Sequence, residues 1–143
     1  MDRPKIVAKL LVLQGGLLVA VAAIHLSSIP QLHQFLATEV SAANMPTVWP
    51  PFVLSFVIMG ILLIPLGLGT IYCARGILQR ARWAWAIAMI NALTVLSLPV
   101  ALFLIMGRVY FHSVPFLVAS IVITAVGLSM AWPLLWIRRE IIR

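Results

Sequence analysis

Four long stretches of this sequence contain almost no charged side chain. They span residues 6–27, 51–73, 83–106 and 115–137, and Lys9 is the only Asp, Glu, Lys or Arg among them. Each is long enough to cross a lipid bilayer, because a spanning helix needs about 20 mostly apolar residues. Charged residues make up only 9% of the chain, whereas a soluble domain carries roughly 25%. The sequence therefore predicts an all-α integral membrane protein, with residues 1–143 forming one four-helix bundle.

Lys and Arg are concentrated at one end of these predicted helices. The N-terminus, the second connection and the C-terminus carry Arg3, Lys5, Lys9, Arg75, Arg80, Arg82, Arg138, Arg139 and Arg143, and the opposite side has only Arg108. Cytoplasmic segments of membrane proteins carry an excess of Lys and Arg. Both termini are therefore predicted to be cytoplasmic. Short basic clusters at helix ends also argue against nucleic-acid binding, which requires a basic stripe or patch on one face.

The first outer connection, residues 28–50, is long and has helical periodicity. Ser28 can cap a helix, Pro30 suits its first turn, and Asn44 with Pro46 can end it. One face of this segment is apolar, with Leu32, Phe35, Leu36, Val40 and Ala43 at helical spacing. We expect a short amphipathic helix lying on the outer membrane surface.

Small and polar residues predict how the spanning helices pack. Helices within lipid associate through close approach at small residues and through hydrogen bonds between helices. Gly60 and Gly67 are one heptad apart on the second predicted helix, and Gly16 with Ala20 forms a small-xxx-small pair on the first. Gln14 is predicted to hydrogen-bond across helices. The same prediction holds for Asn91 on the third helix.

The candidate functional residues lie toward the predicted outer face. His25, His33 and His112 are there, as are Glu39 and Arg108. Glu39 lies near the apolar stripe of the predicted surface helix, so we expect it to pair with Arg108 or a histidine. Imidazoles also bind transition metals and b-type haem. The histidines, with His25 and His112 foremost, are therefore candidate ligands for haem or copper.

Catalytic constellations are missing from the sequence. Its only carboxylates are Asp2, Glu39 and Glu140, too few for a typical Mg²⁺-dependent transferase. Cys73 is the single cysteine, which excludes a CxxC redox pair. We therefore expect no enzymatic activity.

Two segments resemble small, uncharacterised prokaryotic four-helix membrane proteins. Residues 75–99 carry RGIL, then RARWA, Asn91 and a Leu-Pro pair, and residues 23–26 carry AIHL. The likeness covers about a third of the chain and implies a four-helix architecture without an activity. We expect a multi-pass protein of the bacterial inner membrane.

These observations lead to one expected function and two alternatives. The expected function is an accessory or structural subunit of a larger membrane protein complex, in contact with lipids and with other subunits. The first alternative is an outer-face haem, copper or quinone site that serves electron transfer. The second is a protein that binds lipid or a hydrophobic small molecule.

Overall fold

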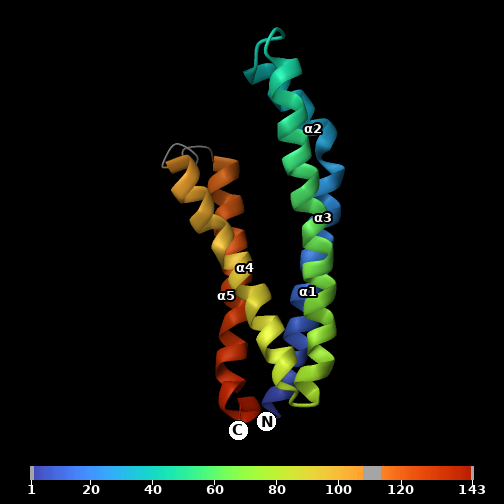
Figure 1. Cartoon of the computed structure of the whole chain (residues 1–143), viewed down its shortest axis with the longest axis vertical. Coiled ribbons are helices and arrows are strands. Elements are labelled where there is room, and N and C mark those ends of the chain that lie inside the picture. Colours follow the sequence, from blue (N-terminus) through green and yellow to red (C-terminus); the bar gives the residue numbers. More distant parts are fainter. Residues whose placement is uncertain (1, 108–113, 143) are drawn as a thin grey trace. The chain divides into compact units, whose positions relative to one another are not determined.

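The computed structural model describes residues 2–107 and 114–142, and every described secondary-structure element is helical. The helices are α1 (Arg3–Ser27), α2 (Ile29–Glu39), α3 (Met45–Leu78), α4 (Arg82–Met106) and α5 (Val114–Ile142) (Figure 1). Four of them, α1, α3, α4 and α5, are long and apolar enough to cross a membrane. The four predicted spanning segments therefore each correspond to one of these helices.

Three of the spanning helices extend beyond their predicted ends. α1 begins at Arg3 instead of residue 6, because Asp2 accepts the first backbone hydrogen bonds at its carbonyl and Pro4 occupies the first turn. α5 continues to Ile142 instead of residue 137, so its last turns carry charged residues beyond the apolar stretch. An apolar run marks the part of a helix that lies in lipid, and the helix itself can be longer.

The largest difference is at the start of α3, which begins at Met45 and not at residue 51. Asn44 with Pro46 is predicted to end the surface helix there, yet Pro46, Pro50 and Pro51 are all helical. Pro46 lies in the first turn, where no backbone donor is needed. Pro50 and Pro51 remove donors to the carbonyls of residues 46 and 47, which are exposed residues in the first turn of α3.

A helix is present in the connection between α1 and α3, but it is shorter than predicted. α2 ends at Glu39, and Asn44 and Pro46 stand at the start of α3 instead of the end of α2. Ser28 occupies the N-cap position, but its hydroxyl donates backwards to the carbonyls of Ile24 and His25. Pro30 lies in the first turn as predicted.

The chain divides into two compact units, and the division falls inside two continuous helices. Unit 1 comprises Met1–Gln14 and Gly69–Arg143, and unit 2 comprises Gly15–Leu68. The N-terminal part of α1 and the C-terminal part of α3 thus belong to unit 1, together with α4 and α5. The rest of α1 and α3 forms unit 2 with α2.

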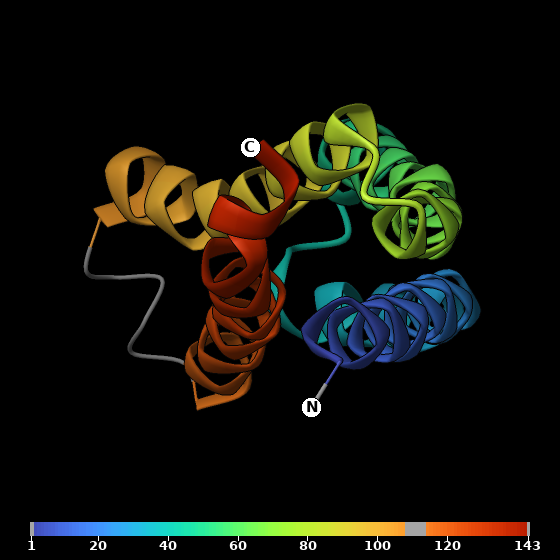
Figure 2. The same cartoon turned by 90° about the horizontal axis from the view of Figure 1, so that it is seen from below.

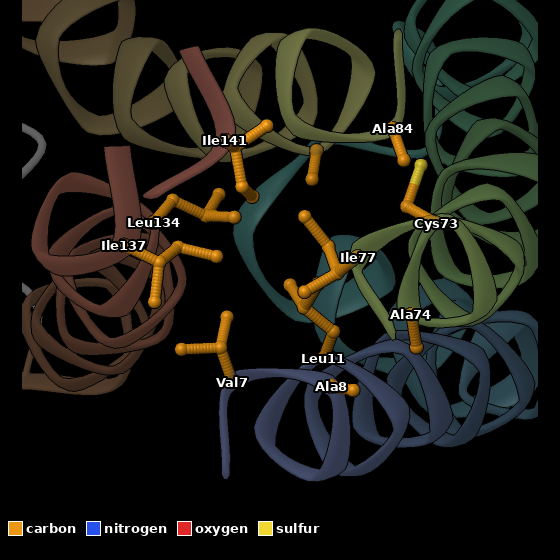
Figure 3. Close-up of a cluster of buried hydrophobic side chains, with 11 residues drawn as sticks. Val7, Ala8, Leu11, Cys73, Ala74, Ile77, Ala84, Leu134, Ile137 and Ile141 are labelled. Carbon is orange, nitrogen blue, oxygen red and sulfur yellow. The ribbon is translucent and has the colours of Figure 1, made fainter. Parts of the chain in front are cut away.

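Unit 1 has an apolar core near the two chain termini. Val7 and Leu11 from α1 and Ile77 from α3 are fully or almost fully buried. Leu134 and Ile137 from α5 complete the centre of this cluster, and Ala84 and Ala88 contribute from α4 (Figure 3). Both termini and the α3–α4 turn lie at this end of the unit (Figures 1 and 2). The basic segments at residues 3–9, 75–82 and 138–139 therefore share one end of unit 1.

The α3–α4 turn closes tightly because Arg80 adopts a left-handed conformation, with φ of 55°. Its N–H donates to the Ile77 carbonyl at 3.0 Å, and the N–H of Ala81 donates to the Gly76 carbonyl at 2.9 Å. These two bonds form a Schellman motif, which satisfies carbonyls at the end of α3. The turn places α4 next to α3, and a Cβ on Gly76 would contact Ala84.

In unit 2, two glycines of α3 allow α1 to approach closely. A Cβ on Gly67 would lie 2.7 Å from the carbonyl oxygen of Gly15. A Cβ on Gly60, two turns away, would lie 2.6 Å from Cδ2 of Leu26. The heptad spacing of these glycines therefore marks the contact face with α1, as packing in lipid requires.

Candidate functional site

His25 is held against α3 by a ring stack and a hydrogen bond. Its imidazole lies 3.6 Å from the Phe56 ring, centroid to centroid, with 18° between the planes. Its Nε2 lies 3.0 Å from the carbonyl oxygen of Phe56. Because a carbonyl only accepts, His25 donates from Nε2 and keeps its lone pair on Nδ1. In this arrangement Nε2 is unavailable to a metal, and one ring face is covered.

His33 contacts a different aromatic residue of α3. Its ring meets that of Trp49 edge-on, with centroids 4.6 Å apart. Trp49 and Phe56 are seven residues apart on α3, which corresponds to about 10 Å along the helix axis. Two nitrogens bound to one metal ion lie within about 4 Å of each other. This arrangement does not bring His25 and His33 together as joint ligands of one ion.

Of the other three residues predicted at the outer face, the structure describes only Glu39. His112 and Arg108 lie outside the described residues, so their predicted roles stay predictions. Glu39 is the last residue of α2 and is exposed, while Leu36 is the buried residue of that helix. An exposed carboxylate does not require a partner, and the predicted pairing of Glu39 with Arg108 or a histidine stays a prediction. Within residues 2–107 and 114–142 no group of three His, Cys, Asp or Glu side chains could hold a metal.

Gln14 joins α1 to α5 inside unit 1. Its Nε2 donates to the Ser129 carbonyl at 2.6 Å and to the Ser129 hydroxyl at 3.2 Å. In an α-helix the Ser129 carbonyl would accept from residue 133, but that residue is Pro133, which has no N–H. Gln14 supplies the missing donor. Its own Oε1 is buried without a hydrogen-bond partner.

Two further side chains form hydrogen bonds between helices in unit 1. Nδ2 of Asn91 donates to the hydroxyl of Thr70 on α3 at 3.1 Å. Nε1 of Trp85 donates to the Leu134 carbonyl on α5 at 2.8 Å. Gln14 and Asn91 are predictable from the sequence as interhelical donors, whereas their partners and the bond of Trp85 are not. The position of Pro133, four residues after Ser129, was the signal that could have found the Gln14 acceptor.

Two of the three carboxylates are paired with basic residues at the chain termini. Glu140 lies 3.4 Å from Arg3, whose guanidinium also stands over the Trp136 ring. Asp2 lies 2.9 Å from Nζ of Lys5. The hydrogen bond from Lys5 holds the pKa of the Asp2 carboxyl below its ordinary value of 3.8. The two contacts of Arg3 link the N-terminal residues to α5, whereas the Asp2–Lys5 pair lies within the first turn.

One face of α1 in unit 2 is open and lined by small residues. Gly16, Ala20, Ala23 and Ser27 recur at helical spacing, and all four are exposed. A Cβ on Gly16 would have nothing within 4 Å. Within unit 2, Gly16 and Ala20 therefore lie on an exposed face, and their predicted role in packing stays a prediction. Large side chains such as Ile24, which is 67% exposed, border this open face.

No protein-family model, curated protein or solved structure matches this chain. The short motifs at residues 23–26 and 75–99 therefore remain a resemblance in sequence pattern only.

Proposed function

We propose that this chain is a non-enzymatic accessory subunit of a larger complex in the bacterial inner membrane. The observation that carries the proposal is the open small-residue face of α1, formed by Gly16, Ala20, Ala23 and Ser27. In lipid, small residues on a helix surface allow a second helix to approach closely, and this contact drives association. A helix surface that contacts only lipid gains no stability from a row of small residues.

The position of this face within unit 2 supports a partner outside the chain. α3 contacts α1 at Gly15 and Leu26. The four small residues occupy other positions of α1, and all of them are exposed. A helix of another protein can therefore reach this face.

The contacts of His25 distinguish this proposal from the electron-transfer alternative. His25, one of the two foremost candidate ligands, donates a hydrogen bond from Nε2 to the Phe56 carbonyl, and its ring stacks on the Phe56 ring. Haem or copper binding at His25 through Nε2 would first break this contact. A subunit that packs through α1 leaves the contact intact.

Two matched substitutions test the proposal. Ala20→Leu fills the centre of the open face, and Ala86→Leu adds the same atoms at an exposed position of α4. We expect the wild-type protein and the Ala86→Leu variant, gently extracted from the native membrane, to migrate together with other subunits on native gels. The Ala20→Leu variant should migrate alone. If all three proteins migrate alone, or if all keep the same partners, the proposed role of this face is wrong.

A further inference from the structure

A groove between α1 and α3 in unit 1 combines a basic rim with an apolar interior. It has a volume of about 630 Å³. Lys5, Lys9 and Arg75 supply its charge. Ala8, Val12, Ile71 and Ala74 supply apolar walls. This composition is that of a binding site for an amphiphile with a negative head.

The charged and apolar parts of the groove follow the order found in a phospholipid. Ala8 and Ala74 face each other across the two helices (Figure 3). Lys9 directly follows Ala8 in the chain, and Arg75 directly follows Ala74. One turn further into the membrane, α1 presents Val12 and α3 presents Ile71. A ligand here would meet cations near the chain termini and hydrocarbon toward the bilayer centre.

Among the described residues of unit 1, both side-chain carboxylates are engaged by basic residues other than Lys9 and Arg75. The sequence has three acidic side chains. Asp2 is engaged with Lys5, and Glu140 with Arg3. The third, Glu39, belongs to α2 in unit 2. An anion from outside the chain is therefore the natural partner of these two side chains.

The geometry points to a specific site for one anionic phospholipid, with its phosphate between Lys9 and Arg75 and an acyl chain along Val12 and Ile71. Basic pockets between transmembrane helices bind anionic head groups in this way. The inference does not depend on the accessory-subunit proposal, because it concerns a different part of α1 and a lipid in place of a protein.

Native mass spectrometry of the full chain tests the site. The protein would be reconstituted with equal amounts of phosphatidylglycerol and phosphatidylcholine, and the lipid retained after release from detergent would be counted. We expect one phosphatidylglycerol to be retained in preference. Lys9→Gln with Arg75→Gln should weaken that preference about 30-fold, which corresponds to about 2 kcal/mol for two cations near a surface.

A control pair distinguishes a site from general attraction to the basic end. Arg138→Gln with Arg139→Gln removes the same charge from exposed residues that do not line the groove. This pair should leave the preference largely unchanged. Equal losses in the two double variants, or equal retention of both lipids by the wild-type protein, would overturn the inference.

A second pair of variants tests the apolar half without changing charge. Val12→Trp fills the inner end of the groove, and Leu13→Trp places the same side chain at the neighbouring exposed position outside it. Both positions are exposed, so neither change disturbs the core. Retention should fall for Val12→Trp and persist for Leu13→Trp. If the two variants retain phosphatidylglycerol equally, the lipid does not occupy the groove.

Discussion

The side-chain amide of Gln14 donates a hydrogen bond of 2.6 Å to the backbone carbonyl of Ser129. The bond links α1 to α5 at the Ser129 carbonyl. This carbonyl has no backbone donor within α5, because residue 133 is a proline. In lipid no water replaces a missing donor, so such a carbonyl needs a partner from a neighbouring helix. Gln14 and Pro133 are therefore a coupled pair, although they lie near opposite ends of the sequence.

This coupling predicts the outcome of a double-mutant cycle. Gln14→Leu should destabilise the protein by about 0.6 kcal/mol and up to roughly 2, the range of hydrogen bonds between membrane helices. In a Pro133→Ala background the same substitution should cost less, since the alanine that replaces Pro133 donates its own N–H to the Ser129 carbonyl. Unfolding in mixed micelles measures both costs. Equal costs in the two backgrounds would refute the coupling.

The glycines of the α1–α3 contact predict a graded series of Gly→Ala effects. Gly67→Ala places a Cβ 2.7 Å from the backbone oxygen of Gly15, which cannot move easily, and should cost about 1–3 kcal/mol. Gly60→Ala meets the end of the flexible Leu26 side chain and should cost less.

Gly16→Ala is the control for this series, because a Cβ at Gly16 meets nothing within 4 Å. It should be neutral or stabilising by up to about 1 kcal/mol, the gain of Ala over Gly in a helix. All three free energies of unfolding would be measured for the isolated protein in detergent. If Gly16→Ala destabilises as much as Gly67→Ala, the assignment of the contact face is incorrect.

How much of this architecture the sequence could predict depends on the kind of signal. The four spanning helices were predictable because an uninterrupted apolar run can satisfy its backbone in lipid only as a helix. Their ends were not. Pro46 is predicted to end the surface helix, yet it lies in the first turn of α3. Arg138 and Arg139 suggested an end, yet α5 extends past them.

The candidate site was predictable in its residue types and not in its contacts. Gln14 and Asn91 stand out as polar side chains in apolar helices, and each hydrogen-bonds to another helix. His25 stands out as a candidate ligand, but its partner is the Phe56 carbonyl, and no sequence pattern marks a backbone oxygen on another helix. Whether a small residue such as Gly16 faces inward or outward depends on how all the helices pack together.

The contact of His25 predicts that this residue contributes to helix packing. His25→Phe keeps a ring for the Phe56 stack and loses the hydrogen bond to the Phe56 carbonyl, so it should cost about 0.6 kcal/mol and up to roughly 2. His33→Phe changes an exposed ring and should cost less. An absorption spectrum of the purified wild-type protein should show no Soret band. A Soret band that disappears in His25→Phe would favour the electron-transfer alternative.

The distribution of basic residues predicts which segments face the cytoplasm. The native Cys73 is buried and can be replaced by Ala before single cysteines are introduced. Ala42→Cys in the α2–α3 connection should react with a membrane-impermeant maleimide on intact cells. Gln79→Cys in the α3–α4 turn should react only in inverted vesicles. Labelling of Gln79→Cys from outside the cell would invert the predicted topology.

The most direct test of the account is the mass of the particle that contains this chain after gentle extraction from its native membrane. Native mass spectrometry should find it in a particle with other polypeptides in fixed stoichiometry, and Ala20→Leu should release it from that particle. A wild-type protein that appears as a single chain, or only with copies of itself, would contradict the accessory-subunit proposal.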